Sequence, residues 1–455
     1  MQFELTKAFI EEVREHLDNG NKSAVAGLIA DLHPADVAEI MQQFRDEHAR
    51  DFFELLAQEK RADVFLELDE DWREAVLSSL SSEEIARQII DEIDSDDAAD
   101  LISELPEKQQ QEVMSLLEDD EQADDIRQLM RYPEDSAGGI MAKELVMVRE
   151  DWTIAQGIRE MRKQAEEVNE VYTIYVVNEQ EKLIGTLSLK QMVFNPSSVR
   201  ATFKDVATKE APIFIRAQES AEEAAKVMEK YDLVALPVVD EAGRLLGRIT
   251  IDDVVDIMKE EAERDYQMAS GLSDKVDVSD TVWEVTRARL PWLVIGLMGG
   301  LLVANVISVY EAEIAKITQL ALFMPLIAAM GGNVGVQSSA IVVQGLANSS
   351  IDMQKLLPRL AKEFIVAMVS GLICASIVLG YNIVFEDSTL LGFTVGLALF
   401  SVIIFAALFG TFVPLMLNRF KIDPAVATGP FITTSNDIIG LAIYFMIARQ
   451  FFNLG

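Results

Sequence analysis

The C-terminal third of the chain alternates long apolar runs with short polar loops. Five of these runs are long enough to cross a bilayer, which takes about 20 residues. They are Leu290–Tyr310, Leu320–Val343, Phe364–Phe385, Leu390–Leu417 and Ala425–Ala448. The pattern therefore predicts a transmembrane domain of five helices over residues 281–455.

Residues 1–131 show short apolar stretches at helical spacing, separated by frequent breaks. Val37, Ile40 and Phe44, for example, lie three or four residues apart and so share one face of a helix. Ser81 and the pair His33-Pro34 stand where helices are expected to begin. Because the pattern recurs loosely, we predict an all-α domain of stacked helix pairs that form a small superhelix.

Between these two parts the chain repeats itself. Gly185 and Gly247 are 62 residues apart, and so are Val177 and Val239. Each copy predicts a helix, a strand, a turn, a second strand and a further helix. We therefore expect a tandem α/β pair, with one repeat over residues 132–199 and the other over residues 200–258.

The charge of the chain is very unevenly distributed. Residues 281–455 contain nine acidic and nine basic side chains, so residues 1–280 carry the whole net charge of −36. Such an acidic segment repels nucleic acid and attracts cations, although an acid excess can also serve only solubility. We expect no nucleic-acid partner.

Basic residues in the loops predict the orientation in the membrane. The pairs Arg287 and Arg289, Arg359 and Lys362, and Arg419 and Lys421 stand before the first, third and fifth runs. Cytoplasmic loops are rich in Lys and Arg, so we expect a cytosolic N-terminus and a C-terminus outside. The charged, amphipathic start of the chain does not resemble a signal peptide.

The chain has few residues suited to catalysis or to soft metals. Cys374 is the single cysteine, and the three histidines show no ligand spacing. A disulfide framework and a cysteine metal cluster are therefore excluded. We assign no catalytic residue and expect no enzyme.

An acidic connecting segment over residues 252–280 joins the repeat pair to the membrane part. Asp252, Asp256 and Glu260 lie four residues apart and share one helix face, where like charges are destabilising unless cations offset them. A solvated surface face is the alternative. The candidate regulatory ligands of this helix and of the N-terminal domain are Asp252, Asp253, Asp256, Glu260, Asp96, Asp97 and Asp100.

One acid, Asp437, stands in the middle of the fifth apolar run. A carboxylate at membrane depth costs about 3 kcal/mol or more, and such groups usually face an ion path or a buried partner. Gly429 and Pro430, about two turns earlier, can break the helix. A bond to a hydroxyl on a neighbouring helix is the simpler alternative.

The second apolar run offers further oxygen ligands. Asn333 and Gln337 share one helix face and could present carbonyl oxygens to a cation or to its water molecules. Gly331 and Gly335 allow close helix contact. We predict a pore site for a cation at Asp437, Asn333, Thr433 and Gln337.

Several motifs together resemble one family. They are Tyr-Pro-Glu-Asp-Ser-Ala-Gly-Gly-Ile-Met at 132–141, the tandem repeat, Gly-Gly-Asn-Val-Gly-Val-Gln at 331–337, and the Asp-Pro-Ala, Gly-Pro and Asp positions between 423 and 437. The whole chain resembles the MgtE family of bacterial magnesium channels and transporters, and the repeat resembles a CBS pair, a module that commonly binds adenosine nucleotides or metals. The resemblance implies a homodimer in the inner membrane that takes up Mg²⁺, with its central ion site at Asp437. It also implies closure of the pore when internal Mg²⁺ binds the cytosolic carboxylates.

The same resemblance suggests a nucleotide site and a range of cargo ions. In the CBS pattern a Ser or Thr and an Asp hold a ribose, and Thr250 and Asp253 match these positions in the second repeat. The first repeat has Ser188 but Gln191 in place of the acid. Whether ATP binds stays open on the sequence; if it does, the second repeat should contribute through Thr250 and Asp253, and the other cleft should be weak. Mg²⁺ retains water and prefers few carboxylates, which suits Asp437. Co²⁺ and Mn²⁺ are other possible cargo.

Two other functions stay open on the residues alone. A membrane-anchored CBS sensor of metal or nucleotide would not need Asp437 in a span, whereas an ion-coupled divalent cation transporter would. Flux that depends on a proton or sodium gradient would identify the transporter.

Overall fold

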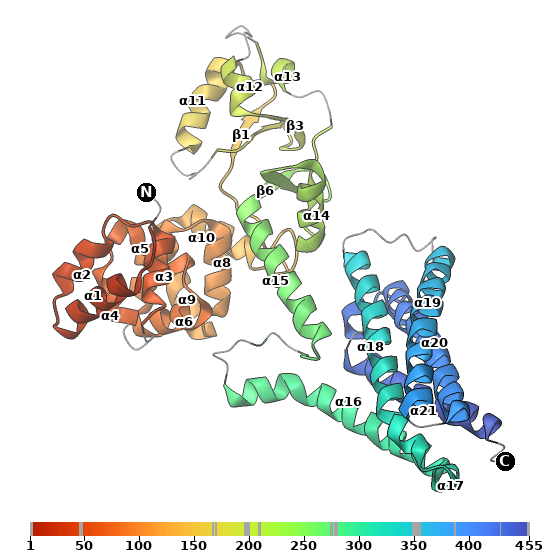
Figure 1. Cartoon of the computed structure of the whole chain (residues 1–455). Helices are drawn as coiled ribbons and strands as arrows, with labels where there is room; N and C mark the ends of the chain where they lie inside the picture. Colours follow the sequence, from red (N-terminus) through yellow and green to blue (C-terminus); the bar gives the residue numbers. More distant parts are fainter. Residues whose placement is uncertain are drawn as a thin grey trace. The chain divides into compact units, whose positions relative to one another are not determined.

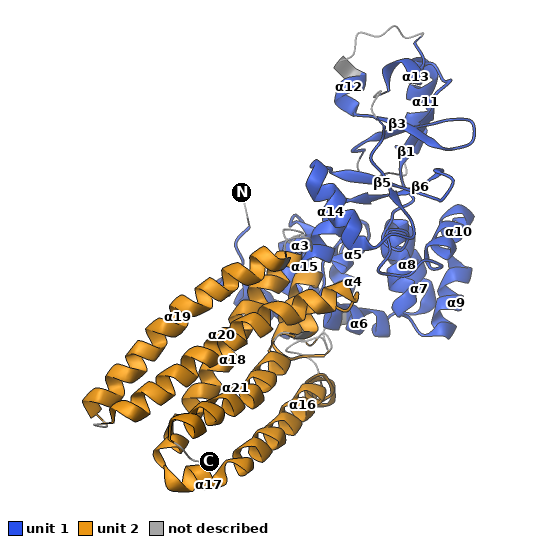
Figure 2. Cartoon of the chain, turned by 90° about the vertical axis from the view of Figure 1, so that its right-hand side faces the viewer, with its two compact units in different colours: residues 1–259 blue, residues 260–455 orange. Residues whose placement is uncertain are grey.

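The computed structural model describes residues 3–44, 49–165, 168, 171–194, 201–207, 211–273, 276, 281–347, 356–385, 388–427 and 429–452. The chain divides into two compact units, Met1–Lys259 and Glu260–Gly455, which Figure 2 shows in different colours.

The first unit begins with a succession of short helices (Figure 1). They are α1 (Lys7–Asp18), α2 (Lys22–Ile29), α3 (Pro34–Met41), α4 (Ala49–Leu55), α5 (Gln58–Leu66), α6 (Glu70–Ser79), α7 (Ser82–Gln88), η2 (Ile90–Glu92), α8 (Ser95–Glu104), α9 (Glu107–Leu116) and α10 (Asp120–Leu129). His33 caps α3, and Ser81 caps α7 in a capping box with Glu84. The all-α prediction for this part is confirmed.

The two repeats each form a three-stranded sheet with flanking helices. Their elements are β1 (Val146–Arg149), α11 (Ile154–Gln164), β2 (Ile174–Val177), β3 (Leu183–Leu187), α12 (Leu189–Phe194) and α13 (Phe203–Val206), then β4 (Ile215–Arg216), α14 (Ala221–Tyr231), β5 (Ala235–Val239) and β6 (Leu245–Thr250). In each sheet the first two strands are parallel and the last two antiparallel. Val176 pairs with Gly185, and Val238 pairs with Gly247, so the 62-residue offset reappears in the strand register.

The N-terminal helices and the second repeat share one hydrophobic core. Buried residues of the N-terminal helices, the junction and the second repeat form a single cluster. The first repeat packs around a separate cluster, to which Phe203 at the start of the second repeat also belongs. The junction motif joins the parts, because the backbone N–H of Ala137 donates to the Glu219 carbonyl at 2.7 Å. This packing brings the acidic residues of the N-terminal helices close to those of the second repeat.

The connecting helix α15 (Ile251–Ala269) is shorter than the expected segment 252–280. It ends where Ser270 and Gly271 close the last turn, with Gly271 at φ +84°, a left-handed conformation that suits glycine. Residues 274–275 and 277–280 of the expected segment lie outside the described residues.

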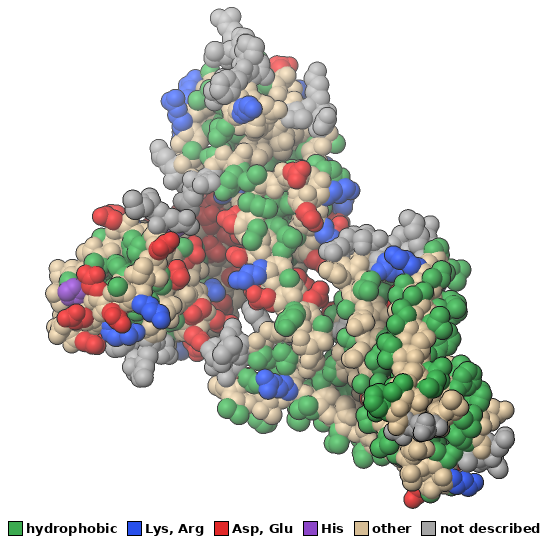
Figure 3. All heavy atoms as spheres, viewed as in Figure 1, with side chains coloured by type: hydrophobic (Ala, Val, Ile, Leu, Met, Phe, Trp, Pro, Cys, Tyr) green, Lys and Arg blue, Asp and Glu red, His purple; other side chains and the backbone are tan. Residues whose placement is uncertain are grey.

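The second unit contains the five predicted spans. Its elements are α16 (Val282–Val309), α17 (Glu311–Lys316), α18 (Gln319–Ala347), α19 (Leu356–Phe385), α20 (Thr389–Arg419), η4 (Pro424–Ala427) and α21 (Pro430–Phe451). Five of these helices are long and apolar enough to cross a membrane. Figure 3 shows hydrophobic side chains over much of the surface of this unit. On α19, Ile365, Val369 and Ile373 are exposed. This surface suits contact with lipid.

The fifth span differs from its sequence-based prediction. The apolar run begins at Ala425, but α21 begins only at Pro430, after the short helix η4. Gly429 has φ +61° and Pro430 occupies the first helical turn, where its missing N–H is not needed. The Gly-Pro pair thus starts the last helix instead of breaking one, and Asp437 lies two turns inside it.

We expect Gly138→Ala to destabilise the junction by about 1–3 kcal/mol, because the site is fully packed. A methyl group there would come 2.6 Å from Cδ1 of Tyr132 and 2.9 Å from the Ala217 carbonyl oxygen. The control is Gly27→Ala in α2, which has open space around it and should be neutral or stabilising by about 0.5–1 kcal/mol. Melting temperatures of the two purified variants would check this, and equal values would contradict the packing argument.

Candidate functional site

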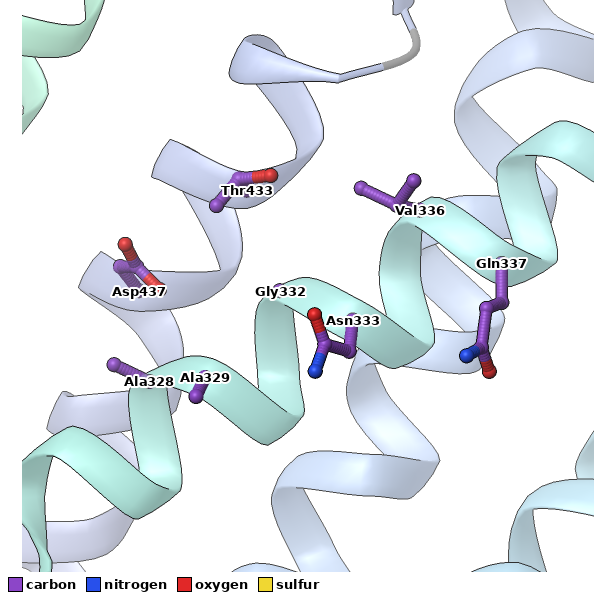
Figure 4. Close-up of a pocket in the computed structure, with 8 residues that line it drawn as sticks. All are labelled: Ala328, Ala329, Gly332, Asn333, Val336, Gln337, Thr433 and Asp437. Carbon is purple, nitrogen blue, oxygen red and sulfur yellow. The ribbon is translucent and has the colours of Figure 1, made fainter.

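A cavity of about 410 Å³ lies between α18 and α21 in the membrane unit (Figure 4). Helix α18 contributes Ala328, Ala329, Gly332, Asn333, Val336 and Gln337, and α21 contributes Thr433 and Asp437. All four residues of the predicted pore site therefore line one cavity. Their role as ion ligands stays a prediction.

The first turns of α21 determine where its polar side chains lie. Thr433 donates its hydroxyl to the Gly429 carbonyl at 3.0 Å, and Asp437 follows one turn later on the same face. Asp437 is half-buried, and no salt bridge joins it to a Lys or Arg within the described ranges. A carboxylate in that position is available for a hydrated cation.

The side chains of Asn333 and Gln337 lie one turn apart on α18, at the cavity. Asn333 is exposed in the single chain. Amides at membrane depth are unfavourable against lipid but suit a water-filled path. The cavity is thus suited to hold water on the side where these amides lie.

The end of α15 contacts the start of α21. A methyl group on Gly271 would come 2.9 Å from Cγ of Pro430, and one on Gly429 would come 2.6 Å from the Ala269 carbonyl oxygen. Both contacts lie within the second unit. Movement at the end of α15 can therefore act directly on the first turn of α21.

The first unit contains an acidic cluster at the start of α8. Carboxylate oxygens of Asp94, Asp96 and Glu144 lie within 4.8 Å of one another. Glu144 is held in place by Ser95, whose backbone N–H and hydroxyl donate to its two oxygens at 3.2 and 3.0 Å. Oxygens gathered in this way fit a partly hydrated Mg²⁺ ion.

Burial and mutual repulsion disfavour the charged forms of these acids. Burial, followed by the charge of Glu144, raises the pKa of Asp94 to about 6. Burial, followed by the charge of Asp253, raises the pKa of Asp97 to about 7. The pKa of the almost inaccessible Asp96 is raised well above its usual value by burial and then by the charge of Asp97. A bound cation would relieve this repulsion.

The structure brings together only part of the predicted regulatory set. Asp96, Asp97 and Asp253 belong to one electrostatic cluster, in which Asp252 and Asp100 also act on Asp97. Asp256 and Glu260 are exposed on α15. The role of the whole predicted regulatory set in cation binding stays a prediction.

Sequence reasoning missed two members of the cluster. The sequence around Asp94 indicates only a helix cap, and Glu144 is an isolated acid. The available signal was the junction motif at 132–141, because Glu144 follows it by three residues. Ala142, just after the motif, pairs with Arg248 of β6, and Arg248 lies 3.9 Å from Asp94.

The expected nucleotide residues contact each other. Thr250 donates its hydroxyl to Asp253 at 2.6 Å and its backbone N–H to the same oxygen at 3.1 Å, at the start of α15. Ser188 and Gln191 form the corresponding pair in the first repeat, at 3.2 Å between hydroxyl and amide oxygen. Asp253 therefore belongs both to the expected ribose site and to the acidic cluster.

Comparison with known proteins covers every part of this architecture. A family model described as a divalent cation transporter matches residues 324–447, the MgtE intracellular N domain matches 32–135, and the CBS domain matches 137–195 and 203–260. The magnesium transporter MgtE of Bacillus subtilis (strain 168) is 31% identical over 437 residues, which are 96% of this chain and 95% of that protein. The chain belongs to the MgtE family of magnesium transporters. Its CBS pair, its helical N-terminal domain and its nature as a membrane protein are thereby confirmed.

Two further similarities agree with this family. The magnesium transporter MgtE of Thermus thermophilus is 31% identical over 444 residues, with 96% of this chain and 97% of that protein covered. A solved structure of the cytosolic domain of the Mg²⁺ channel MgtE in complex with ATP is 32% identical, with a TM-score of 0.50. The match covers 55% of this chain and 99% of the solved one.

The raised pKa values predict a pH-dependent stability of the metal-free protein. Asp94 and Asp97 titrate at about 6 and 7 when folded, against an ordinary value of 3.8. The folded state therefore binds more protons than the unfolded state between these values, so stability falls as pH rises from about 4 to about 7. Mg²⁺ should raise the melting temperature more above pH 7 than below pH 5, because protons compete for the same oxygens.

The double variant Asp94→Asn, Asp97→Asn is the control for this measurement. Its metal-free stability should depend less on pH, since two of the titrating groups are gone. Equal stabilisation by Mg²⁺ at both pH values in the unmodified protein would contradict the assignment of the cluster as a cation site.

Proposed function

We propose that this protein is a Mg²⁺ channel of the bacterial inner membrane that takes up Mg²⁺ and closes when internal Mg²⁺ binds its acidic cytosolic cluster. The observation that carries this proposal is the cavity between α18 and α21, lined by Asp437, Asn333, Gln337 and Thr433. An acid beside two amides at membrane depth suits a hydrated divalent cation, whereas a membrane anchor has no use for it.

The pore is completed by a second copy of the chain. Asn333 is exposed in one protomer at membrane depth, which is stable only if protein or water covers it. A twofold axis along this face would place two Asp437 carboxylates around one path. Two carboxylates with retained water match the ligand preference of Mg²⁺, and Co²⁺ or Mn²⁺ of similar coordination could follow the same path.

Gating follows from the repulsion among the cytosolic acids. Without Mg²⁺ the cluster at Asp94, Asp96, Asp97 and Glu144 favours separation of the elements that carry it, and bound Mg²⁺ draws them together. Three acids on α15 would likewise repel without Mg²⁺ and be drawn in when it binds: Asp252, Asp256 and Glu260. Because α15 ends against the start of α21, this change can close the pore. Internal Mg²⁺ is then a negative-feedback ligand.

A nucleotide would tune this response. The similar cytosolic domain of the Mg²⁺ channel MgtE has been solved with ATP. In this chain Thr250 and Asp253 are the residues suited to a ribose, and Asp253 also acts on the acidic cluster. ATP at this cleft would therefore change the cation affinity of the cluster.

Asp437→Ala should reduce Mg²⁺ flux into proteoliposomes by at least about 100-fold, because it removes the carboxylate that replaces part of the ion's hydration. Asp437→Asn should fail similarly, since the charge matters more than the shape. Glu311→Gln, an exposed acid on α17, is the matched control and should conduct normally. Normal flux through both Asp437 variants would overturn the pore assignment, and flux that requires a proton or sodium gradient would favour the coupled transporter.

Glu144→Gln should weaken closure by internal Mg²⁺ while leaving maximal flux unchanged. The change removes one of three clustered carboxylates but keeps a side chain that can accept from Ser95. We expect the inhibitory Mg²⁺ concentration inside proteoliposomes to rise about tenfold. Glu179→Gln, a largely exposed acid of the first repeat, should leave inhibition unchanged. Equal inhibition of the two variants would show that the cluster does not sense Mg²⁺.

A further inference from the structure

Asn436 is the residue immediately before Asp437 on α21, and its environment is unusual. The side chain is 1% exposed, and neither its amide nitrogen nor its oxygen has a hydrogen-bond partner among the residues that the structure describes. Buried polar groups are normally paired, because an unmade hydrogen bond in an apolar interior is costly. An amide in this position therefore calls for a hydrogen-bond partner other than the described protein groups.

Two other asparagines of the membrane unit behave differently. Asn305 and Asn382 each donate their side-chain N–H to the carbonyl four residues earlier, at 2.9 Å in both cases. The amide nitrogen of Asn436 makes no such bond to Ile432, although Asn436 lies in a regular helix. Its side chain extends away from its own helix towards α18.

A glycine of α18 makes room for that side chain. A methyl group on Gly335 would overlap the amide nitrogen of Asn436 and would come 2.7 Å from Cγ2 of Ile432. Gly335 is also close to α20, because a methyl group on Gly410 would overlap the Gly335 carbonyl. Gly335 is therefore a point at which α18, α20 and α21 approach one another closely.

Holding Asn436 at this point sets the direction of Asp437. Consecutive residues of a helix point about 100° apart, so one turn of α21 presents Asn436 to Gly335 and Asp437 to the cavity. Apolar packing against Gly335, which has no side chain, gives little resistance to rotation of α21 about its own axis. Hydrogen bonds of an amide are directional and would resist that rotation.

We propose that Asn436 is a positioning residue for Mg²⁺ permeation, whose amide fixes the rotation of α21 and thereby the direction of the Asp437 carboxylate. This rests on the proposed role of Asp437 in the pore. In this proposal the hydrogen bonds of the amide go to a buried water molecule, as internal water pairs with buried polar groups elsewhere.

The test separates the amide from the space it fills. Asn436→Leu keeps a similar volume but removes the directional bonds. The Mg²⁺ concentration for half-maximal flux in proteoliposomes should rise about tenfold, equivalent to about 1.4 kcal/mol, with the melting temperature unchanged or higher. Unchanged half-saturation, or a lower maximal flux that merely follows a lower melting temperature, would overturn the proposal.

A second set of variants keeps the test decisive if Asn436→Leu folds poorly. Gly335→Ala should lower both stability and flux. Adding Asn436→Ala should restore part of the stability, because the contact with Ile432 remains, but should leave half-saturation raised. Full recovery of half-saturation in the double variant would reduce the role of Asn436 to packing. Gly331→Ala is the control one turn away, where the added methyl group lies 3.1 Å from Val402 and 3.8 Å from the Asn436 Cβ and carbonyl oxygen.

Asp437→Ala in the same assay tests the proposed pore separately. Normal flux through that variant would refute the proposed pore, whatever the result for Asn436.

Discussion

The free-energy cost of an ionised carboxylate inside an apolar bundle is the constraint on which the membrane unit depends. At membrane depth this cost is about 3 kcal/mol or more unless water, a cation or a partner group offsets it. The structure offsets it by opening a cavity beside Asp437 and by lining that cavity with the amides of Asn333 and Gln337. Close helix contacts at Gly335 and Gly299 hold α21 against α18 and α16 around the cavity. The apolar packing of α20 in turn supports these helices.

The first unit also contains buried carboxylates, but there several of them are crowded together instead of one standing alone. Several carboxylates are crowded where burial raises their pKa values, and the contact of Arg248 with Asp94 at 3.9 Å offsets only part of the charge. This crowding is possible because α8 and the second repeat belong to one hydrophobic core, which supplies the stability that the acids reduce. A cation bound at these carboxylates would therefore link its binding to the folding of the metal-free protein.

Periodicity and spacing predicted most of the fold. The apolar runs correspond to the five spans, and the offset between Gly185 and Gly247 reappears as equivalent strand pairing. Asn333, Gln337, Thr433 and Asp437 share a cavity. Helix spacing indicated that Asn333 and Gln337 share one face, but it could not show that their helix lies beside α21. Glu144 could not be predicted, because its proximity to Asp94 comes from tertiary packing between segments about 50 residues apart. The apolar run predicts too early a start for α21, because hydropathy does not register the backbone conformation of Gly429.

The number of acids at each site fits the use that we propose for it. Permeation requires an ion to bind and then to leave, so a weak site with few charges and retained water is suitable. The cavity provides one carboxylate per chain together with neutral amide oxygens. A sensor must instead hold the ion long enough to shift a conformational equilibrium, and that requires a binding free energy that differs between two states. Asp94, Asp96, Asp97 and Glu144 would meet this need, because a cation that neutralises them would also remove their mutual repulsion. On the proposed roles, the same ligand chemistry gives passage where acids are few and retention where they are crowded.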